Sequence, residues 1–148
     1  MNKNAKGHAR EEIVRQVIDG KDSSLNQWKT HITIRNAAKK LRTWENQSVE
    51  TLYLTSRTKP TEVEDMRGVL EKYNFPDGPL FSRREGEEYK DIVERVMPDV
   101  IIEDKCESIG GKDEMTYTQT KQELKHRIRL IAVKEFGGID YLQDNISP

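Results

Sequence analysis

The chain has 148 residues, a length typical of one domain. With 25 Lys and Arg against 26 Asp and Glu, its net charge is −1, which argues against a protein that binds DNA or RNA mainly through phosphate contacts. No apolar run approaches the ~20 residues of a membrane-spanning helix, no secretion signal opens the chain, and the lone Cys106 cannot form an internal disulfide. We therefore expect a cytoplasmic protein with no nucleic-acid and no membrane partner.

The apolar content is low for a domain of this size. Leu, Ile, Val and Phe make up 33 of the residues, or 22%, which is just above the roughly 20% below which disorder becomes the better prediction. The chain therefore has few residues from which to build a core. We expect that an apolar segment is missing or is supplied by a partner.

The predicted elements alternate between helices and strands along the chain. Residues 1–7 are polar and are expected to fray, and residues 8–33 are predicted to form a helix followed by a loop. Further helices are predicted over 36–47, 61–73, 87–97 and 121–127, and strands over 49–54, 80–81, 99–103 and 128–133. The helix over 61–73 is expected to begin with a capping box, Thr61 at the cap and Glu64 three residues later. This alternation predicts an α/β fold with a parallel sheet covered on both faces.

Polar side chains follow two of the predicted strands. Thr55 and Arg57 come after the first strand, and Asp104 follows the strand over 99–103. In parallel sheets ligands bind beyond the carboxyl ends of the strands, where a hydroxyl with an Arg can hold a phosphate and a carboxylate can hold a hard cation. Lys90, in the helix that leads into the strand over 99–103, can pair with both. The pattern predicts a Mg²⁺-dependent phosphoryl-transfer site.

Each of these residues also has a simpler interpretation. A Thr at a strand end is commonly a turn or cap residue, and Lys90 lies between charged neighbours that are typical of a solvated helix face. Asp104 can cap the next turn, and Glu103 can be a capping or solvated group. Cys106 has no His partner in the sequence pattern, which favours a small packed side chain over a nucleophile.

Three segments resemble a known family when they are read in order. They are LYLTSR (52–57), NFPDGPL (74–80) and YKDIVERVMPDVIIED (89–104), and they are similar to the haloacid dehalogenase-like (HAD) superfamily, in particular its small phosphatases. The resemblance covers residues 34–142 and implies a three-layer, Rossmann-like fold. It implies that Thr55 binds the phosphoryl oxygens, that Lys90 neutralises charge, and that Asp104 helps to hold Mg²⁺. An intact member attacks a phosphate monoester with an Asp, and water then hydrolyses the aspartyl-phosphate.

The sequence departs from the family in its first motif, the D-x-D that carries the nucleophile. No D-x-D occurs in the 148 residues, and no apolar run of four or more precedes residue 49. We therefore expect the first strand of the family's sheet, which lies between those ending at Thr55 and Glu103, to be missing. Either the chain begins at an internal Met1, downstream of that strand, or it is a divergent member without the chemistry. We favour the first explanation, because a predicted helix follows Met1 almost directly.

The sequence as a whole predicts a single HAD-like domain over residues 1–148. Residues 34–142 form its core, and residues 8–33 are a possible remnant of a cap. The intact form is expected to be a Mg²⁺-dependent phosphomonoester phosphatase that acts on a small phosphorylated molecule, and this chain is expected to be inactive without the nucleophile. The alternative is a non-catalytic module that binds a partner or forms a homo-oligomer, because a sheet without its middle strand exposes unpaired backbone groups. The sequence does not indicate the substrate, because specificity in this superfamily usually resides in inserted caps.

Overall fold

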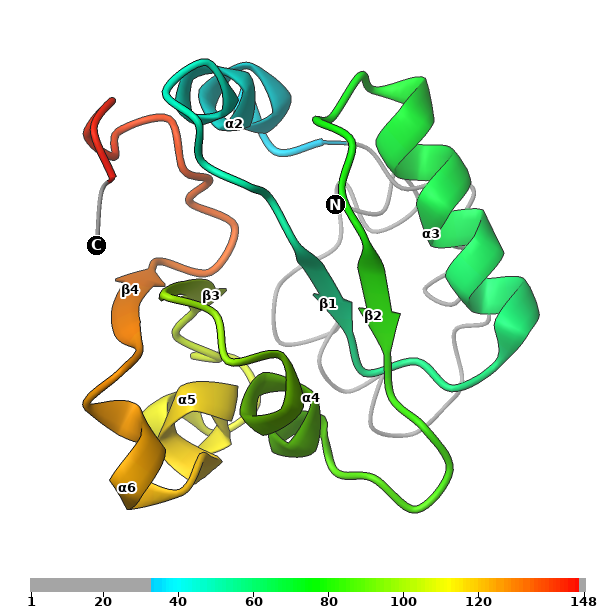
Figure 1. Ribbon diagram of the computed structural model, residues 1–148, viewed down its shortest axis with the longest axis vertical. Helices are drawn as coiled ribbons and strands as arrows, with labels where there is room; N and C mark the ends of the chain where they lie inside the picture. The colour runs from blue at the N-terminus through cyan, green and yellow to red at the C-terminus, as the bar shows by residue number, and fades with distance from the viewer. Residues whose placement is uncertain (1–32, 147–148) are drawn as a thin grey trace.

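The computed structural model describes residues 33–146, and the predicted N-terminal helix and almost all of the predicted cap remnant lie outside them. In the described part, helices alternate with short parallel strands (Figure 1). None of its helices is long and apolar enough to cross a membrane. The elements are α2 (Ala37–Glu45), β1 (Tyr53–Thr55), α3 (Pro60–Lys72), β2 (Leu80–Ser82), α4 (Tyr89–Val96), β3 (Val100–Asp104), the 3₁₀ helix η4 (Gly111–Glu114), α5 (Thr116–Gln119), α6 (Gln122–Lys125) and β4 (Arg129–Val133).

The strands of the described residues form two separate pairs. β1 is parallel to β2, with Thr55 opposite Ser82, and β3 is parallel to β4, with Asp104 opposite Val133. The parallel direction and the alternation with helices confirm an α/β arrangement. The expected single sheet of three layers is seen only as these two small sheets, because no described strand pairs with both β1 and β3.

The two pairs present backbone edges that no described strand covers. The amide of Tyr53 donates to the Pro79 carbonyl beside β2, and the amide of Lys105 donates to the Val133 carbonyl of β4. Backbone groups alternate in direction along a strand, so the amide and carbonyl groups of Leu54 and Ile102 point away from these partners. Among residues 33–146, one edge of β1 and one edge of β3 thus lack a strand partner.

A small apolar core joins the two strand pairs. Val93 of α4, Ile101 of β3 and Ile128, which precedes β4, are buried against one another. Leu54 of β1 packs on this cluster although β1 belongs to the other pair. The two sheets are therefore parts of one packed unit, with Val93 of α4 in the core that joins them.

The helix ends differ in part from the prediction. The capping box predicted at Thr61 is wrong, because α3 already begins at Pro60 with Lys59 as its N-cap. Proline is favoured at the first helical position because an amide there has no acceptor within the helix, so the absence of an N–H in proline costs no helical hydrogen bond. A capping box occurs instead at α4, where the Glu88 side chain accepts from the third helical amide and Asp91 accepts from the Glu88 amide. α4 ends at Met97 in a left-handed conformation, directly before Pro98.

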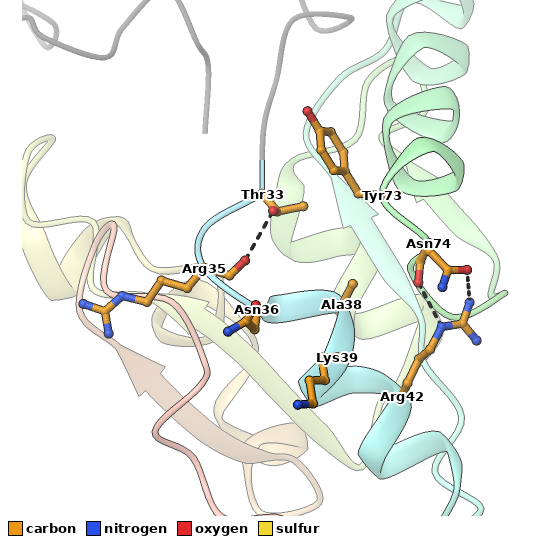
Figure 2. Close-up of a pocket in the computed structure, with 8 residues that line it drawn as sticks. All are labelled: Thr33, Arg35, Asn36, Ala38, Lys39, Arg42, Tyr73 and Asn74. Carbon is orange, nitrogen blue, oxygen red and sulfur yellow. Dashed lines mark hydrogen bonds between the residues drawn. The ribbon is translucent and has the colours of Figure 1, made fainter.

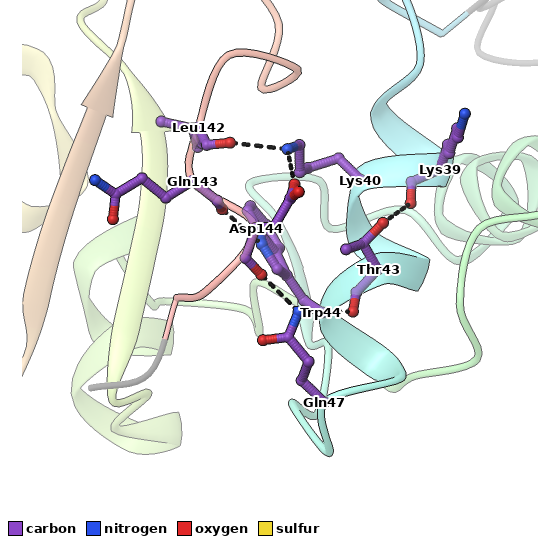
Figure 3. A network of polar contacts seen from close by, with 8 residues as sticks. All are labelled: Lys39, Lys40, Thr43, Trp44, Gln47, Leu142, Gln143 and Asp144. Carbon is purple, nitrogen blue, oxygen red and sulfur yellow. Dashed lines mark hydrogen bonds and ion pairs between the residues drawn. The ribbon is translucent and has the colours of Figure 1, made fainter.

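The C-terminal segment, residues 139–146, is attached to α2 (Figure 3). The indole N–H of the buried Trp44 donates to the Gln143 carbonyl at 3.0 Å, and Lys40 donates to the Leu142 carbonyl at 2.8 Å. The Gln47 amide donates to the Asp144 carbonyl at 2.7 Å. These bonds tie together the two ends of the described chain.

Candidate functional site at the carboxyl ends of β1 and β3

Thr55 is buried at the carboxyl end of β1 and uses its hydroxyl within the protein. Its Oγ1 donates to the Met66 sulfur of α3 at 3.2 Å and accepts from the Arg57 amide at 3.3 Å. The second bond is that of a turn residue, as the simpler interpretation predicted. A thioether is a weak acceptor, so an oxygen of an anionic ligand can replace Met66 as the partner of the hydroxyl.

Lys90 is the second residue of α4, where it pairs with the residue that caps the helix. Its Nζ lies 3.0 Å from Oε2 of Glu88. The hydrogen bond and the charge of Glu88 raise the pKa of Lys90, so the ammonium is charged at neutral pH. The side chain is partly exposed, and a ligand can compete with Glu88 for it.

The two acidic residues at the end of β3 have different surroundings. Asp104 is exposed, and its Oδ1 accepts from the Cys106 amide at 2.8 Å. The Glu103 carboxylate accepts from the amides of Thr116 at 3.0 Å and Tyr117 at 2.7 Å, at the start of α5. Glu103 is therefore occupied in holding a helix start, which agrees with its predicted capping role. Asp104 stabilises the turn after β3 through its bond to the Cys106 amide, and its carboxylate is exposed at the end of the strand.

Tyr89, the first residue of α4, links these positions. Its hydroxyl donates to the Leu54 carbonyl at 3.1 Å, on the edge of β1 that faces away from β2. Burial raises the pKa of Tyr89 to about 12, and the charges of Glu103 and Asp104 add to the shift. Tyr89 thus contacts β1 beside Thr55, precedes Lys90, and lies within the electrostatic reach of Asp104. Among the described residues, Thr55, Lys90 and Asp104 bond to other partners and not to one another, so Tyr89 is the link between the end of β1 and the start of α4.

The part of the chain that the structure describes does not make a metal site by itself. No three His, Cys, Asp or Glu side chains gather there in a way that could hold a metal ion. Asp104 supplies one carboxylate at the predicted position, and the D-x-D carboxylates that the family resemblance implies are not in the sequence.

Cys106 does not have the surroundings of a nucleophile. Burial raises the pKa of its thiol to about 12, and the charge of Asp104 and hydrogen bonding with the Asp104 side chain add to the shift. The thiol also donates to the Asp104 carbonyl at 3.7 Å. A thiol, rather than a thiolate, is therefore present at neutral pH. This agrees with the prediction of a packed side chain, and Cys106 is half-buried.

A separate pocket of about 420 Å³ lies at the start of α2 (Figure 2). Arg42, one of its cations, is already committed, because it donates to the side-chain oxygen of Asn74 at 2.8 Å and to the carbonyls of Asn74 and Phe75. The Arg35 side chain extends away from Arg42 in Figure 2. Of the cations that line the pocket, Arg42 is therefore held by the protein itself. Its lining residues are Thr33, Arg35, Asn36, Ala38, Lys39, Arg42, Tyr73 and Asn74.

The sequence pattern did not reveal what Tyr89 contributes to the site. The bond from its hydroxyl to the Leu54 carbonyl spans 35 residues of sequence. No local pattern encodes such a contact.

Comparison with known proteins adds no relative: no family model, curated protein or solved structure matches the chain.

Proposed function

We propose that the chain is a HAD-like domain that binds a small phosphate monoester without hydrolysing it. The observation that carries the proposal is the contact of Tyr89 with Leu54, which brings the start of α4, with Lys90, to the end of β1, with Thr55. In this proposal Thr55 donates its hydroxyl to a phosphoryl oxygen, and Lys90 leaves Glu88 to neutralise the phosphate charge. Both groups are donors of the kind that a phosphate requires.

The proposed absence of turnover follows from the missing nucleophile. Hydrolysis through an aspartyl-phosphate needs a carboxylate that attacks phosphorus, and the resemblance assigns this role to the first Asp of a D-x-D that the sequence lacks. Thr55 is a buried hydroxyl with no described His, Asp or Glu among its hydrogen-bond partners. Binding is therefore the part of the chemistry that the residues of this chain support.

Titration with orthophosphate tests the binding site. We expect Lys90→Ala and Thr55→Val each to weaken orthophosphate binding, measured by isothermal titration calorimetry, by about tenfold or more, because each removes a direct donor. Lys72→Ala, at the exposed last turn of α3, is the matched control and should leave the affinity unchanged. Equal affinities for all four proteins would contradict the proposed site.

A hydrolysis assay tests the second half of the proposal. The 148-residue chain, incubated with para-nitrophenyl phosphate and Mg²⁺, should release no nitrophenol above the rate of Lys90→Ala. Turnover that Lys90→Ala abolishes would show that the chain has a nucleophile that the sequence pattern does not reveal.

A second candidate function, that of a module that accepts a strand from a partner, is favoured by the open edges of β1 and β3. These edges belong to two parallel pairs with a shared core, so a strand inserted between them can bond to both. Amide hydrogen exchange at Leu54 and Ile102 tests this function. Protection that rises with protein concentration, together with a dimer in light scattering, would support it, whereas rapid exchange in a monomer at every concentration would contradict it.

A further inference from the structure

Two arginines lie side by side where β1 and β2 end. Arg83 directly follows β2, and Arg57 lies two residues beyond the end of β1. The Arg83 amide donates to the Arg57 carbonyl at 3.2 Å, which continues the hydrogen bonding of the pair beyond the strands themselves. The backbones of two cationic residues are thus held together at the carboxyl end of the sheet, the end at which ligands of parallel sheets bind.

Neither arginine is simply a solvated surface residue. Both are half-buried, and Nε of Arg83 is buried without a hydrogen-bond partner. Burial lowers the pKa of Arg57; Glu62 opposes this shift, and the charge of Arg83 adds to it. Burial of the Arg57 charge and burial of an Arg83 N–H without an acceptor each carry a desolvation cost. An anion that reaches both guanidinium groups offsets both effects.

We propose that Arg57 and Arg83 form a subsite for a second anionic group of the ligand, so that the protein prefers phosphates that carry a further phosphate or carboxylate. This inference rests on the proposed phosphate site, to which the subsite is connected through the bond from the Arg57 amide to the Thr55 hydroxyl. The planar guanidinium groups suit the paired oxygens of either anion. The ligand then spans from Thr55, at the end of β1, towards the end of β2.

Inorganic pyrophosphate and orthophosphate are the probes that test the subsite. We expect the full 148-residue chain, titrated in the calorimeter without divalent metal, to bind pyrophosphate about tenfold more tightly than orthophosphate. Arg83→Gln and Arg57→Gln should each remove most of this preference, and Arg83→Gln should leave orthophosphate binding unchanged. Arg84→Gln, an exposed neighbour of Arg83, is the matched control and should keep the preference.

Thermal unfolding provides a measurement that separates binding from folding. Without ligand, Arg83→Gln should unfold at no lower a temperature than the parent chain, because the substitution removes a half-buried charge whose Nε–H has no acceptor. Pyrophosphate should raise the unfolding temperature of the parent chain and of Arg84→Gln, and it should raise that of Arg83→Gln much less. A conservative variant, Arg83→Lys, keeps the charge but loses the guanidinium fork, and its preference should be intermediate.

The outcomes distinguish the subsite from the phosphate site. Equal binding of the two probes by the parent chain, or a preference that survives both Gln variants, would overturn the subsite. If orthophosphate binding depends on Lys90 and no preference exists, the proposed function stands and this inference fails. If pyrophosphate binding depends on Arg57 and Arg83 but not on Lys90, the arginine subsite stands and the proposed function fails.

Discussion

Single side chains at the candidate site have structural partners as well as proposed ligand roles. The Thr55 hydroxyl contacts Met66, Lys90 pairs with Glu88, and Asp104 holds the turn to Cys106. Tyr89 differs from Lys90 and Asp104 because its partner, the Leu54 carbonyl, lies on another element, and it differs from Thr55 because that partner is a backbone carbonyl and not a weak sulfur acceptor. In the proposed function, a ligand at Thr55 or Lys90 would replace weak or exposed partners, whereas the Tyr89 bond is part of the framework that keeps β1 against α4.

The pH dependence of unfolding tests the role of Tyr89. Its pKa of about 12 lies above the ordinary value of 10, so the protonated phenol stabilises the folded state fully below pH 10. That contribution is lost as the pH rises from 10 through 12. Urea denaturation should show that Tyr89→Phe costs about 1 kcal/mol at pH 8, through the lost hydrogen bond, and loses less stability than the parent chain between pH 10 and 12.

Two further tyrosines enter this comparison. The pKa of Tyr53 is also raised to about 12, chiefly by burial, so part of the alkaline loss remains in Tyr89→Phe. Tyr141→Phe, at a residue that is 61% exposed, is the control and should leave the stability at pH 8 unchanged. An alkaline loss identical in Tyr89→Phe and the parent chain would contradict the role of Tyr89.

The elements themselves follow local rules that the sequence shows well. Helices predicted over 36–47, 61–73 and 87–97 occur as α2, α3 and α4, and the predicted strands at 80–81 and 128–133 occur as β2 and β4. The prediction was least accurate for the strand over 49–54, since β1 is formed by Tyr53–Thr55. The length of β1 depends on which of its residues pair with β2. That pairing begins only at Tyr53, which lies opposite Leu80.

Two glycines provide a test at the level of the elements. Gly68 lies within α3, and a Cβ built there meets nothing within 4 Å, so Gly68→Ala should raise the free energy of unfolding by about 0.5–1 kcal/mol through helix propensity. A Cβ on Gly78 would lie 2.0 Å from the Thr51 carbonyl oxygen, just before β1 and β2 pair. Gly78→Ala should therefore lower the free energy of unfolding by about 1–3 kcal/mol. Chemical denaturation of both variants checks the opposite signs, and a gain in both would contradict the close approach at Gly78.

At the scale of the whole molecule, two small sheets share a core that only a few apolar residues build. Val93, Ile101 and Ile128 are its buried members, and Leu54 connects it to β1. Apolar side chains are also buried in α2 and in the C-terminal segment, where Trp44 is fully buried and Ile146 is 6% exposed. The low apolar content of the sequence is consistent with a core of this small size.

Removal of residues 143–148 tests the attachment of the C-terminal segment. The truncation removes the acceptor of the Trp44 indole N–H and the buried Ile146, so it should lower the free energy of unfolding by at least about 2 kcal/mol. Asp144→Asn in the full chain is the control, because its ion pair with Lys40 is exposed on the Asp side and should contribute at most about 0.5 kcal/mol. A truncated chain as stable as the parent would show that the segment contributes nothing to stability.

Hydrophobic periodicity, Pro60 and the turn residues were enough to predict the order and type of most elements, because these depend on neighbours within a few positions of one another. The same patterns placed Thr55, Lys90 and Asp104 at strand and helix ends. Only the tertiary structure decided that the strands form two pairs, that Tyr89 bonds to Leu54, and that Arg57 lies beside Arg83. Each of these contacts joins residues at least 26 positions apart, and it forms only because packing brings distant backbone groups within hydrogen-bond distance.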